Sequence, residues 1–225
     1  MNILAIETST KILSIAVLTK NTCNEITKET KNHASSLLPL IIELLNKSGV
    51  EKENLDYIAV SSGPGSFTGL RIGASTAKAI AHGLNIPIIS VPTLAALAYN
   101  FKNSGKEIIP VIDARRGTVY AQRFNTKNEI APINDVETIH AIDLINNTKK
   151  EAIILGDGVS IFNNIDMPPN IKICYDLSHC AKMVGKLALQ YISENSNIFQ
   201  YFEYEPTYYK KTQAEREYNE KNNNS

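Results

Sequence analysis

Apolar and polar positions alternate with two different periods over the first fifty residues. The segments "NILAIET", "ILSIAVLTK" and "CNEITKET" are rich in β-branched residues and separated by polar turns, which predicts a meander of strands over residues 2–8, 12–20 and 23–30. From residue 33 onward, apolar residues recur every three or four positions until Gly49. That spacing predicts a helix whose apolar face is wide enough to meet two neighbours.

Strand and helix patterns alternate along the rest of the chain. Residues 55–62 predict an apolar strand, followed by a glycine-rich loop, a helix of small residues ending near Leu84, and a strand at 86–91. The later predicted elements are a helix at 93–101, strands at 107–115, 118–124 and 152–156, and helices at 139–147 and 180–192. Such alternation implies parallel pairing and an α/β fold of two lobes, joined near residues 100–106.

Composition and charge exclude several classes of protein. The chain has 225 residues, 43% of them hydrophobic, and its 23 Lys and Arg balance its 23 Asp and Glu. A neutral chain has no net field to draw it to a nucleic acid or a membrane, so a partner would supply the basic surface if RNA were bound. Three scattered cysteines, with no C-x-x-C pair, fit a reducing cytoplasm. We expect neither a leader peptide nor a membrane anchor.

Residues 61–83, "SSGPGSFTGLRIGASTAKAIAHG", resemble a phosphate-binding loop in composition only. A P-loop requires a second glycine five positions after the first, but Leu70 stands five positions after Gly65. The dinucleotide motif G-x-G-x-x-G begins at Gly63 and then meets Thr68 in place of its third glycine. Neither phosphate loop is therefore predicted.

Small residues do recur every fourth position in this helix, at Gly69, Gly73, Ala77 and Ala81. This stripe lets another backbone approach closely, and packing against the sheet or another helix explains it without a ligand. Arg71 is different, because a cation near a helix N-terminus opposes the helix dipole. We expect it to face an anion or an acidic partner, with a solvated arginine as the alternative.

Two short segments are candidate nucleotide contacts. They are Glu7, Thr8 and Ser9 at the end of the first strand, and Gly156, Asp157 and Gly158 after the strand at 152–156. Ordinary turn formation is the favoured interpretation of residues 7–9, an ordinary strand-to-helix turn also explains 156–158, and Asp113 fits a turn cap better than a catalytic acid. The four histidines are far apart in sequence, so no metal site is predicted. No serine, cysteine or lysine has a recognisable nucleophile context.

The motifs together resemble one family. "ILAIETS", "HASSLLPLIIELL", "SSGPGSFTGLRIG", "IPIISVPTL", "VIDARRGTVY" and "EPTYYKK" followed by "AER" are similar to the TsaB (YeaZ) family of tRNA threonylcarbamoyladenosine biosynthesis proteins, from Asn2 to about Arg216. The resemblance implies an actin-like, Hsp70-like ATPase (ASKHA) fold of two α/β lobes, each with a mixed sheet and flanking helices. We expect an N-terminal lobe at 1–100, a C-terminal lobe at 101–205, and a C-terminal segment at 206–225 whose end is disordered.

The family implies a function without catalysis by this chain. Its members bind and activate TsaD, the catalytic subunit that makes N6-threonylcarbamoyladenosine (t6A) at position 37 of tRNAs reading ANN codons. In TsaD, two histidines hold a metal at the positions of Thr93 and Leu97 here, and neither of these residues can make that site. The "ETST" segment also lacks the Cys-Asp of the catalytic relative. The resemblance thus implies a degenerate enzyme kept as a scaffold.

Partners and interface follow from the same resemblance. TsaE docks on the TsaB–TsaD pair, TsaC supplies threonylcarbamoyl-AMP, tRNA binds through the complex, and the complex uses ATP and a metal that this chain is not expected to bind. Without TsaD the same surface supports a homodimer. The implied interface residues are Leu37, Leu38, Ile41, Leu45, Phe67, Leu70, Arg71, Gly73, Ala74, Ala77 and Lys78. On this basis, aspartate at Ile41 and Leu45 is expected to abolish partner binding while leaving the fold intact.

Two enzyme classes remain as alternatives. A nucleotide-dependent ATPase or phosphotransferase of the same fold would carry clear phosphate motifs in both lobes, and these are not seen. A metallopeptidase, an older assignment in this superfamily, would need the missing histidines.

Overall fold

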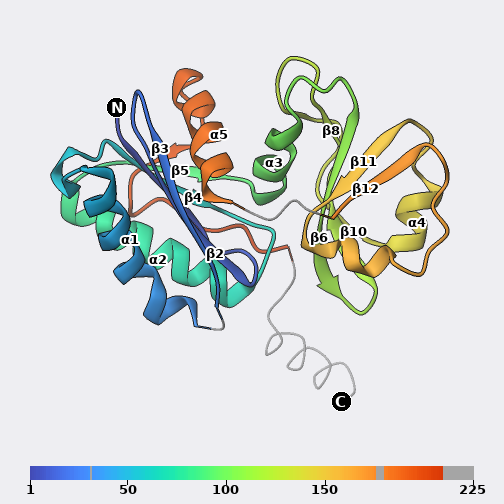
Figure 1. Cartoon of the computed structure of the whole chain (residues 1–225), viewed down its shortest axis with the longest axis horizontal. Helices are drawn as coiled ribbons and strands as arrows, with labels where there is room; N and C mark the ends of the chain where they lie inside the picture. The colour runs from blue at the N-terminus through green and yellow to red at the C-terminus, as the bar shows by residue number, and fades with distance from the viewer. Residues whose placement is uncertain (31, 176–179, 210–225) are drawn as a thin grey trace.

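The computed structural model describes residues 1–30, 32–175 and 180–209, and within them the strands form two sheets in two lobes (Figure 1). The first sheet has the order β13-β5-β4-β1-β2-β3. Its strands are β1 (Ile3–Glu7), β2 (Ile12–Leu18), β3 (Cys23–Glu29), β4 (Tyr57–Ser61), β5 (Ile88–Val91) and β13 (Ile198–Phe199). Strands β1, β4 and β5 run parallel, and β1, β2 and β3 form the predicted antiparallel meander.

Helices cover both faces of this first sheet, as Figure 1 shows. On one face lie α1 (His33–Ser48) and α2 (Phe67–Leu84), while α5 (Ala181–Ser193) lies on the other. Alternate residues of β1 divide between the two faces: Leu4 packs with α1 and α2, whereas Ala5 packs with α5. The strand is apolar throughout because both of its faces are covered.

The second sheet has the order β10-β7-β6-β11-β12, with the short strands β8 and β9 beside β6. Its strands are β6 (Glu107–Arg115), β7 (Thr118–Ala121), β8 (Phe124–Asn125), β9 (Ala131–Pro132), β10 (Glu137–His140), β11 (Ala152–Leu155) and β12 (Ile171–Cys174). Helix α4 (Ala141–Asn146) and the 3-10 turn η3 (Asp157–Phe162) pack on it around Leu144 and Phe162. The mixed α/β architecture of two lobes is therefore confirmed.

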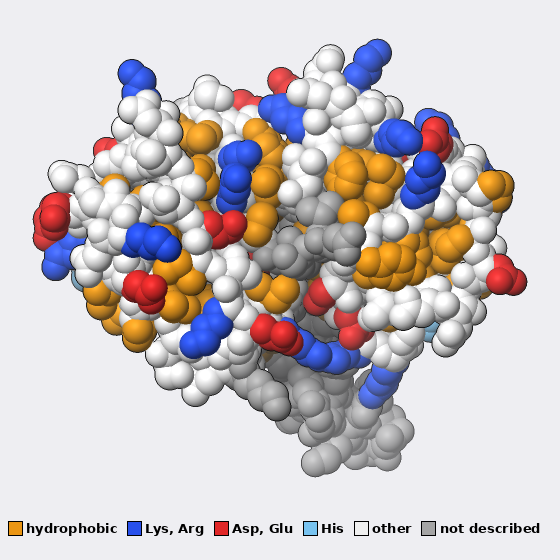
Figure 2. Space-filling model, viewed as in Figure 1, with side chains coloured by type: hydrophobic (Ala, Val, Ile, Leu, Met, Phe, Trp, Pro, Cys, Tyr) orange, Lys and Arg blue, Asp and Glu red, His pale blue; other side chains and the backbone are white. Residues whose placement is uncertain are grey.

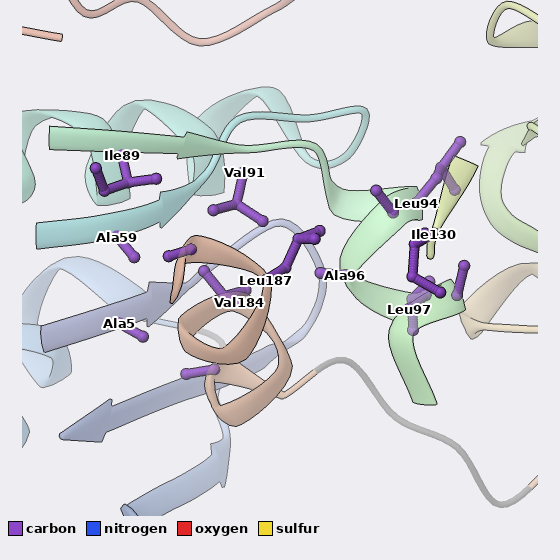
Figure 3. Packing of buried hydrophobic residues seen from close by; sticks show 14 of the residues in the cluster. Ala5, Ala59, Ile89, Val91, Leu94, Ala96, Leu97, Ile130, Val184 and Leu187 are labelled. Carbon is purple, nitrogen blue, oxygen red and sulfur yellow. The ribbon is translucent and has the colours of Figure 1, made fainter. Parts of the chain in front are cut away.

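The lobes share an apolar cluster centred on α3 (Thr93–Ala98), which is followed by the 3-10 turn η2 (Tyr99–Phe101). Figure 3 shows Leu94 and Leu97 of α3 beside Ile130 of the second lobe. In the same cluster, Val184 and Leu187 of α5 lie against the first sheet. Continuous apolar packing thus joins the lobes around α3.

Several boundaries differ from the predicted ones. Helix α5 and strand β13 belong to the first sheet, so the predicted lobe at 101–205 is corrected at its C-terminal end. Ile139 and His140 were predicted to start a helix and instead belong to strand β10, which pairs with β7. Strands β8, β9, β12 and β13 were not predicted, and the 3-10 turn η1 (Lys52–Asn54) precedes β4. The end of the segment 206–225 was expected to be disordered. That prediction concerns residues 210–225, which lie outside the described residues.

Charges are dispersed over the face seen in Figure 2, where Lys and Arg side chains stand among Asp, Glu and neutral residues. Apolar side chains appear on both lobes in that view. No helix in the described part of the chain is long and apolar enough to cross a membrane.

Candidate functional sites

The glycine loop after β4 packs directly onto the turn between β1 and β2. A Cβ atom on Gly65 would lie 2.6 Å from the backbone oxygen of Ser9, and the Ser66 N–H donates to that same oxygen at 2.6 Å. The Ser66 hydroxyl in turn accepts from the Gly69 N–H at 3.2 Å and caps α2. The loop's glycine is therefore needed for close backbone approach within the chain.

The stripe of small residues on α2 also faces inward. A Cβ atom on Gly69 would collide with the carbonyl oxygen of Thr8, and one on Gly73 would collide with the Thr8 hydroxyl. Ala77 and Ala81 are fully buried in the same core. The stripe had been interpreted either as packing within the chain or as part of a partner interface. In the structure these four residues pack within the chain.

The β1–β2 turn holds a buried carboxyl group. Glu7 is 1% exposed, and its Oε1 accepts from the Ser9 N–H at 2.6 Å. Burial raises the pKa of Glu7 to about 6, against the opposing effect of its hydrogen bonds. Thr8 and Ser9 are also buried, and the Thr8 hydroxyl has no hydrogen-bond partner among the described residues. All three residues of this predicted segment are therefore buried within the chain.

The second candidate segment lies across from this turn, in the other lobe. Gly156 has φ +111°, and a Cβ atom on Gly158 would lie 3.1 Å from the backbone nitrogen of Asp113. The Asp113 N–H donates to Asp157 Oδ1 at 3.3 Å. Although Asp157 is exposed as a residue, desolvation of its carboxylate raises its pKa to about 6, and the nearby Asp113 charge adds to the shift. Asp157 also raises the pKa of Glu7, so the structure brings the two predicted segments within electrostatic range.

Asp113 itself closes a turn. Its Oδ1 accepts from the Arg115 N–H at 2.7 Å, the turn-cap role that its sequence context favoured. Arg115 and Arg116 both have positive φ in the tight β6–β7 connection. The nucleotide-binding prediction for residues 7–9 and 156–158 remains untested, and two facing carboxyl groups are a poor environment for a phosphate.

The predicted interface residues fall into two groups. Seven of them face the chain's own core: Leu37, Ile41, Leu45, Leu70, Gly73, Ala74 and Ala77. Four are at least partly accessible: Leu38, Phe67, Arg71 and Lys78. Leu38 is 52% exposed, and Ile42, one turn further along α1 and absent from the prediction, is 54% exposed. An unbroken apolar run on α1 concealed which side faces the sheet.

This division corrects the predicted mutational test. Ile41 is 2% exposed and Leu45 is 9% exposed, so aspartate at either position would place an unpaired charge in the core beneath α1. The variants would unfold the lobe, and loss of binding would say nothing about an interface. Leu38 and Ile42 are the positions where a charge leaves the core untouched.

A shallow groove lies between the start of α1 and the first turns of α2. It has a volume of about 470 Å³ and is lined by Ala34, Phe67, Thr68, Arg71, Ile72, Ser75 and Thr76. The guanidinium carbon of Arg71 lies 4.0 Å from the centre of the Phe67 ring and 5.8 Å from that of Tyr208. Tyr208 was missed from the sequence because it is far from α2 along the chain and carries no local pattern.

Within residues 1–30, 32–175 and 180–209, no three His, Cys, Asp or Glu side chains lie close enough to hold a metal ion. Thr93 is buried, and its hydroxyl accepts from the Gly63 N–H at 3.1 Å. Leu97 is buried in the cluster that joins the lobes. Both positions, where the resemblance placed histidines in TsaD, are structural here.

Comparisons with known proteins agree with the resemblance. The TsaD family model, tRNA N6-adenosine threonylcarbamoyltransferase, matches residues 20–218. The tRNA threonylcarbamoyladenosine biosynthesis protein TsaB of Bacillus subtilis (strain 168) is 36% identical over 167 residues, which cover 72% of this chain and 73% of the relative. TsaB of Buchnera aphidicola subsp. Baizongia pistaciae (strain Bp) is 32% identical over 203 residues, covering 86% and 90%.

Solved structures show the fold. YeaZ from Pseudomonas aeruginosa superimposes with a TM-score of 0.80 at 24% identity and covers 92% of this chain and 99% of its own. A second structure, described as an uncharacterized protein with similarity to peptidase YEAZ from Pseudomonas aeruginosa, has a TM-score of 0.81 at 24% identity, with 93% and 99% covered.

Proposed function

Because this chain belongs to the TsaB family of tRNA threonylcarbamoyladenosine biosynthesis proteins, we propose that it is the noncatalytic subunit that binds and activates TsaD. A role in tRNA threonylcarbamoyladenosine biosynthesis, in the complex that contains TsaD, follows from the family itself. The finer proposal adds a place and a mode of action. TsaD docks on the α1–α2 face, and catalysis takes place in TsaD.

One observation carries the choice of face. Leu38 and Ile42 stand more than half exposed on α1, about one and two turns after Ala34, which lines the groove together with Phe67 and Ile72. The opposite side of α1 is buried against the sheet, so the helix is apolar on both sides. A surface helix normally has a polar outer face, and contiguous exposed apolar residues mark interaction sites.

The noncatalytic part of the proposal is supported by Thr93 and Leu97. Their side chains serve the chain's own packing and hydrogen bonding, and neither residue type is a metal ligand in such sites. In this proposal ATP and the metal act elsewhere in the complex, and TsaC supplies threonylcarbamoyl-AMP. TsaE docks on the pair of this chain and TsaD. The assembled complex holds tRNAs that read ANN codons, in the cytoplasm. Two copies of this chain pair through the same face when TsaD is absent.

The test is the mass of the complex, by light scattering after size exclusion, with TsaD from the same source. The double variant Leu38→Asp, Ile42→Asp places two charges on the docking face, and Ile142→Asp on α4 is the matched control, because Ile142 is 48% exposed in the other lobe. We expect one-to-one complexes for the wild type and the control and none for the double variant, with all three melting within about 2 °C of one another because surface substitutions change stability little.

Two results would contradict the proposal. A double variant that still forms the complex would move the docking site away from α1. A wild-type chain that forms no complex with TsaD, with or without nucleotide, would refute the scaffold role itself.

A second candidate, an ATPase or phosphotransferase of the same fold, is favoured only by the raised pKa values of Glu7 and Asp157, since perturbed carboxyl groups gather at active sites. The buried Thr8 and Ser9 count against it. ATP hydrolysis by this chain alone, abolished by Glu7→Gln, would support it.

A further inference from the structure

The C-terminal segment returns to the first lobe and ends beside the docking face. Tyr204 is fully buried in the core beneath α1 and α2. The Thr207 N–H donates to the Ser62 carbonyl at 2.8 Å, which fixes the segment next to the glycine loop. The Tyr208 ring then lies 4.7 Å from the Phe67 ring, centre to centre, at an angle of 43°. A segment from the end of the chain thus contributes to the start of α2.

Arg71 is held by these two rings. Its guanidinium carbon lies 4.0 Å from the Phe67 ring centre and 5.8 Å from the Tyr208 ring centre, while the residue stays exposed. Among the residues that the structure describes, no carboxylate lies within 4.0 Å of Arg71. Stacking occupies the flat face of a guanidinium and leaves the N–H groups at its edge free to donate. Among the described residues, Arg71 is therefore a pre-oriented donor with no carboxylate partner, at the rim of the groove.

We propose that Arg71 binds an acidic side chain of the docked partner protein and that Tyr208 is the positioning residue that orients it. This inference rests on the proposed docking of TsaD on the α1–α2 face and adds the chemistry of one contact and a contribution from the C-terminal segment. Arginine forms paired hydrogen bonds to a carboxylate, and a stacked arginine loses little conformational freedom when it does so.

A protein carboxylate fits this position better than an RNA phosphate. The groove around Arg71 contains Phe67 and Ile72, with Leu38 exposed nearby, and an apolar centre containing arginine and aromatic residues is typical of a protein interface. A nucleic-acid surface would need clustered Lys and Arg, whereas this chain is neutral and its charges are dispersed in Figure 2.

The experiment measures the affinity of the full chain for TsaD by calorimetry at about 50, 150 and 500 mM salt. Arg71→Met removes the charge and keeps the bulk, Arg71→Lys keeps the charge but not the plane, and Tyr208→Leu removes one ring. Lys127→Met, an exposed cation in the second lobe, is the control. We expect Arg71→Met to weaken binding about 30-fold and to remove most of the salt dependence, and Arg71→Lys to weaken it about 10-fold.

Tyr208→Leu tests positioning separately from fold stability. We expect it to weaken binding about 5-fold in the wild-type chain and to have no effect in the Arg71→Met background, because the residue acts through Arg71. Equal effects of Tyr208→Leu in the two backgrounds would overturn the positioning role.

The outcomes separate this inference from the proposed function. If Arg71→Met binds TsaD like the wild type while Leu38→Asp with Ile42→Asp abolishes binding, the docking face is right and the Arg71 inference is wrong. If Arg71→Met weakens only the binding of tRNA by the assembled complex, the anion is a phosphate and the inference is overturned. If the wild-type chain does not bind TsaD, the proposed function itself fails.

Discussion

Adding one methyl group to α2 at two different glycines should change stability in opposite directions. Gly69→Ala places a Cβ against the Thr8 carbonyl oxygen, a backbone atom that cannot rotate away. Gly83→Ala, in the last turn of the same helix, meets nothing within 4 Å. Overpacking a core costs about 1–3 kcal/mol, and alanine in place of glycine returns about 1 kcal/mol of helix propensity at most.

The collision is with backbone, so the upper end of that range applies to Gly69→Ala, and its net loss should be about 2 kcal/mol. Gly83→Ala should gain about 0.5 kcal/mol, since it lies near a helix end. For a chain of this size, each kcal/mol corresponds to about 2–4 °C in melting temperature, so the two variants should melt about 5–10 °C apart.

Urea unfolding followed by circular dichroism measures both variants against the wild type. The midpoint should fall for Gly69→Ala and rise slightly for Gly83→Ala, with unchanged slopes. Equal stability of the two variants would contradict this prediction, because it would mean that a Cβ atom at position 69 does not collide with Thr8.

Three further predictions concern buried polar groups. Burial raises the pKa of Glu7 from its ordinary 4.5 to about 6, so the folded chain binds more protons between these values and stability falls as pH rises from about 4.5 to 7. Glu7→Gln should therefore stabilise the protein by up to about 2 kcal/mol at pH 8 and not at pH 4, as urea titrations at both pH values would show. Ser14 is buried, and its Oγ accepts from the Ala181 N–H at 3.0 Å. Ser14→Ala should therefore lower the free energy of unfolding by about 1 kcal/mol and speed amide hydrogen exchange at the start of α5. Exchange protection equal to that of the wild type would show that this hydrogen bond does not hold the start of α5. Arg123 and Glu107 form a mostly buried ion pair at 2.7 Å. Glu107→Ala should lower the free energy of unfolding by about 3 kcal/mol, measured by thermal unfolding, because it leaves the Arg123 charge unpaired. A decrease below about 0.5 kcal/mol would contradict this prediction.

The elements that the sequence predicted well are those with a strong local period. The meander over residues 2–30 and helices α1 and α2 have such periods, and the structure has them close to the predicted bounds. Strand β13 has two residues, too few to show any period, and α5 joins the first sheet through contacts between the two ends of the chain. Long-range pairing of this kind leaves no local signal.

The residues of the candidate site were also predicted only as far as local sequence patterns reach. The apolar run on α1 identified the helix but not its inner side, so Ile41 was assigned to an interface and Ile42 was left out. The small-residue stripe on α2 predicted a close approach, and the approaching group proved to be the chain's own Thr8. Arg71 was singled out by its charge near a helix start, but the rings that hold it include Tyr208, which no spacing rule connects to it.

The return of the C-terminal segment to the first lobe affects how the protein is made. The first sheet gains β13 and α5, and its core gains Tyr204, only when residues 181–204 have left the ribosome. Translation from residue 100 to residue 204 takes about 5–20 s, during which the N-terminal lobe lacks one covering helix. The first hundred residues alone should therefore be insoluble as a recombinant fragment. A nascent chain would acquire its finished docking face, with Tyr208 against Phe67, only after residue 208 has been synthesised, so assembly with a partner would wait for that point.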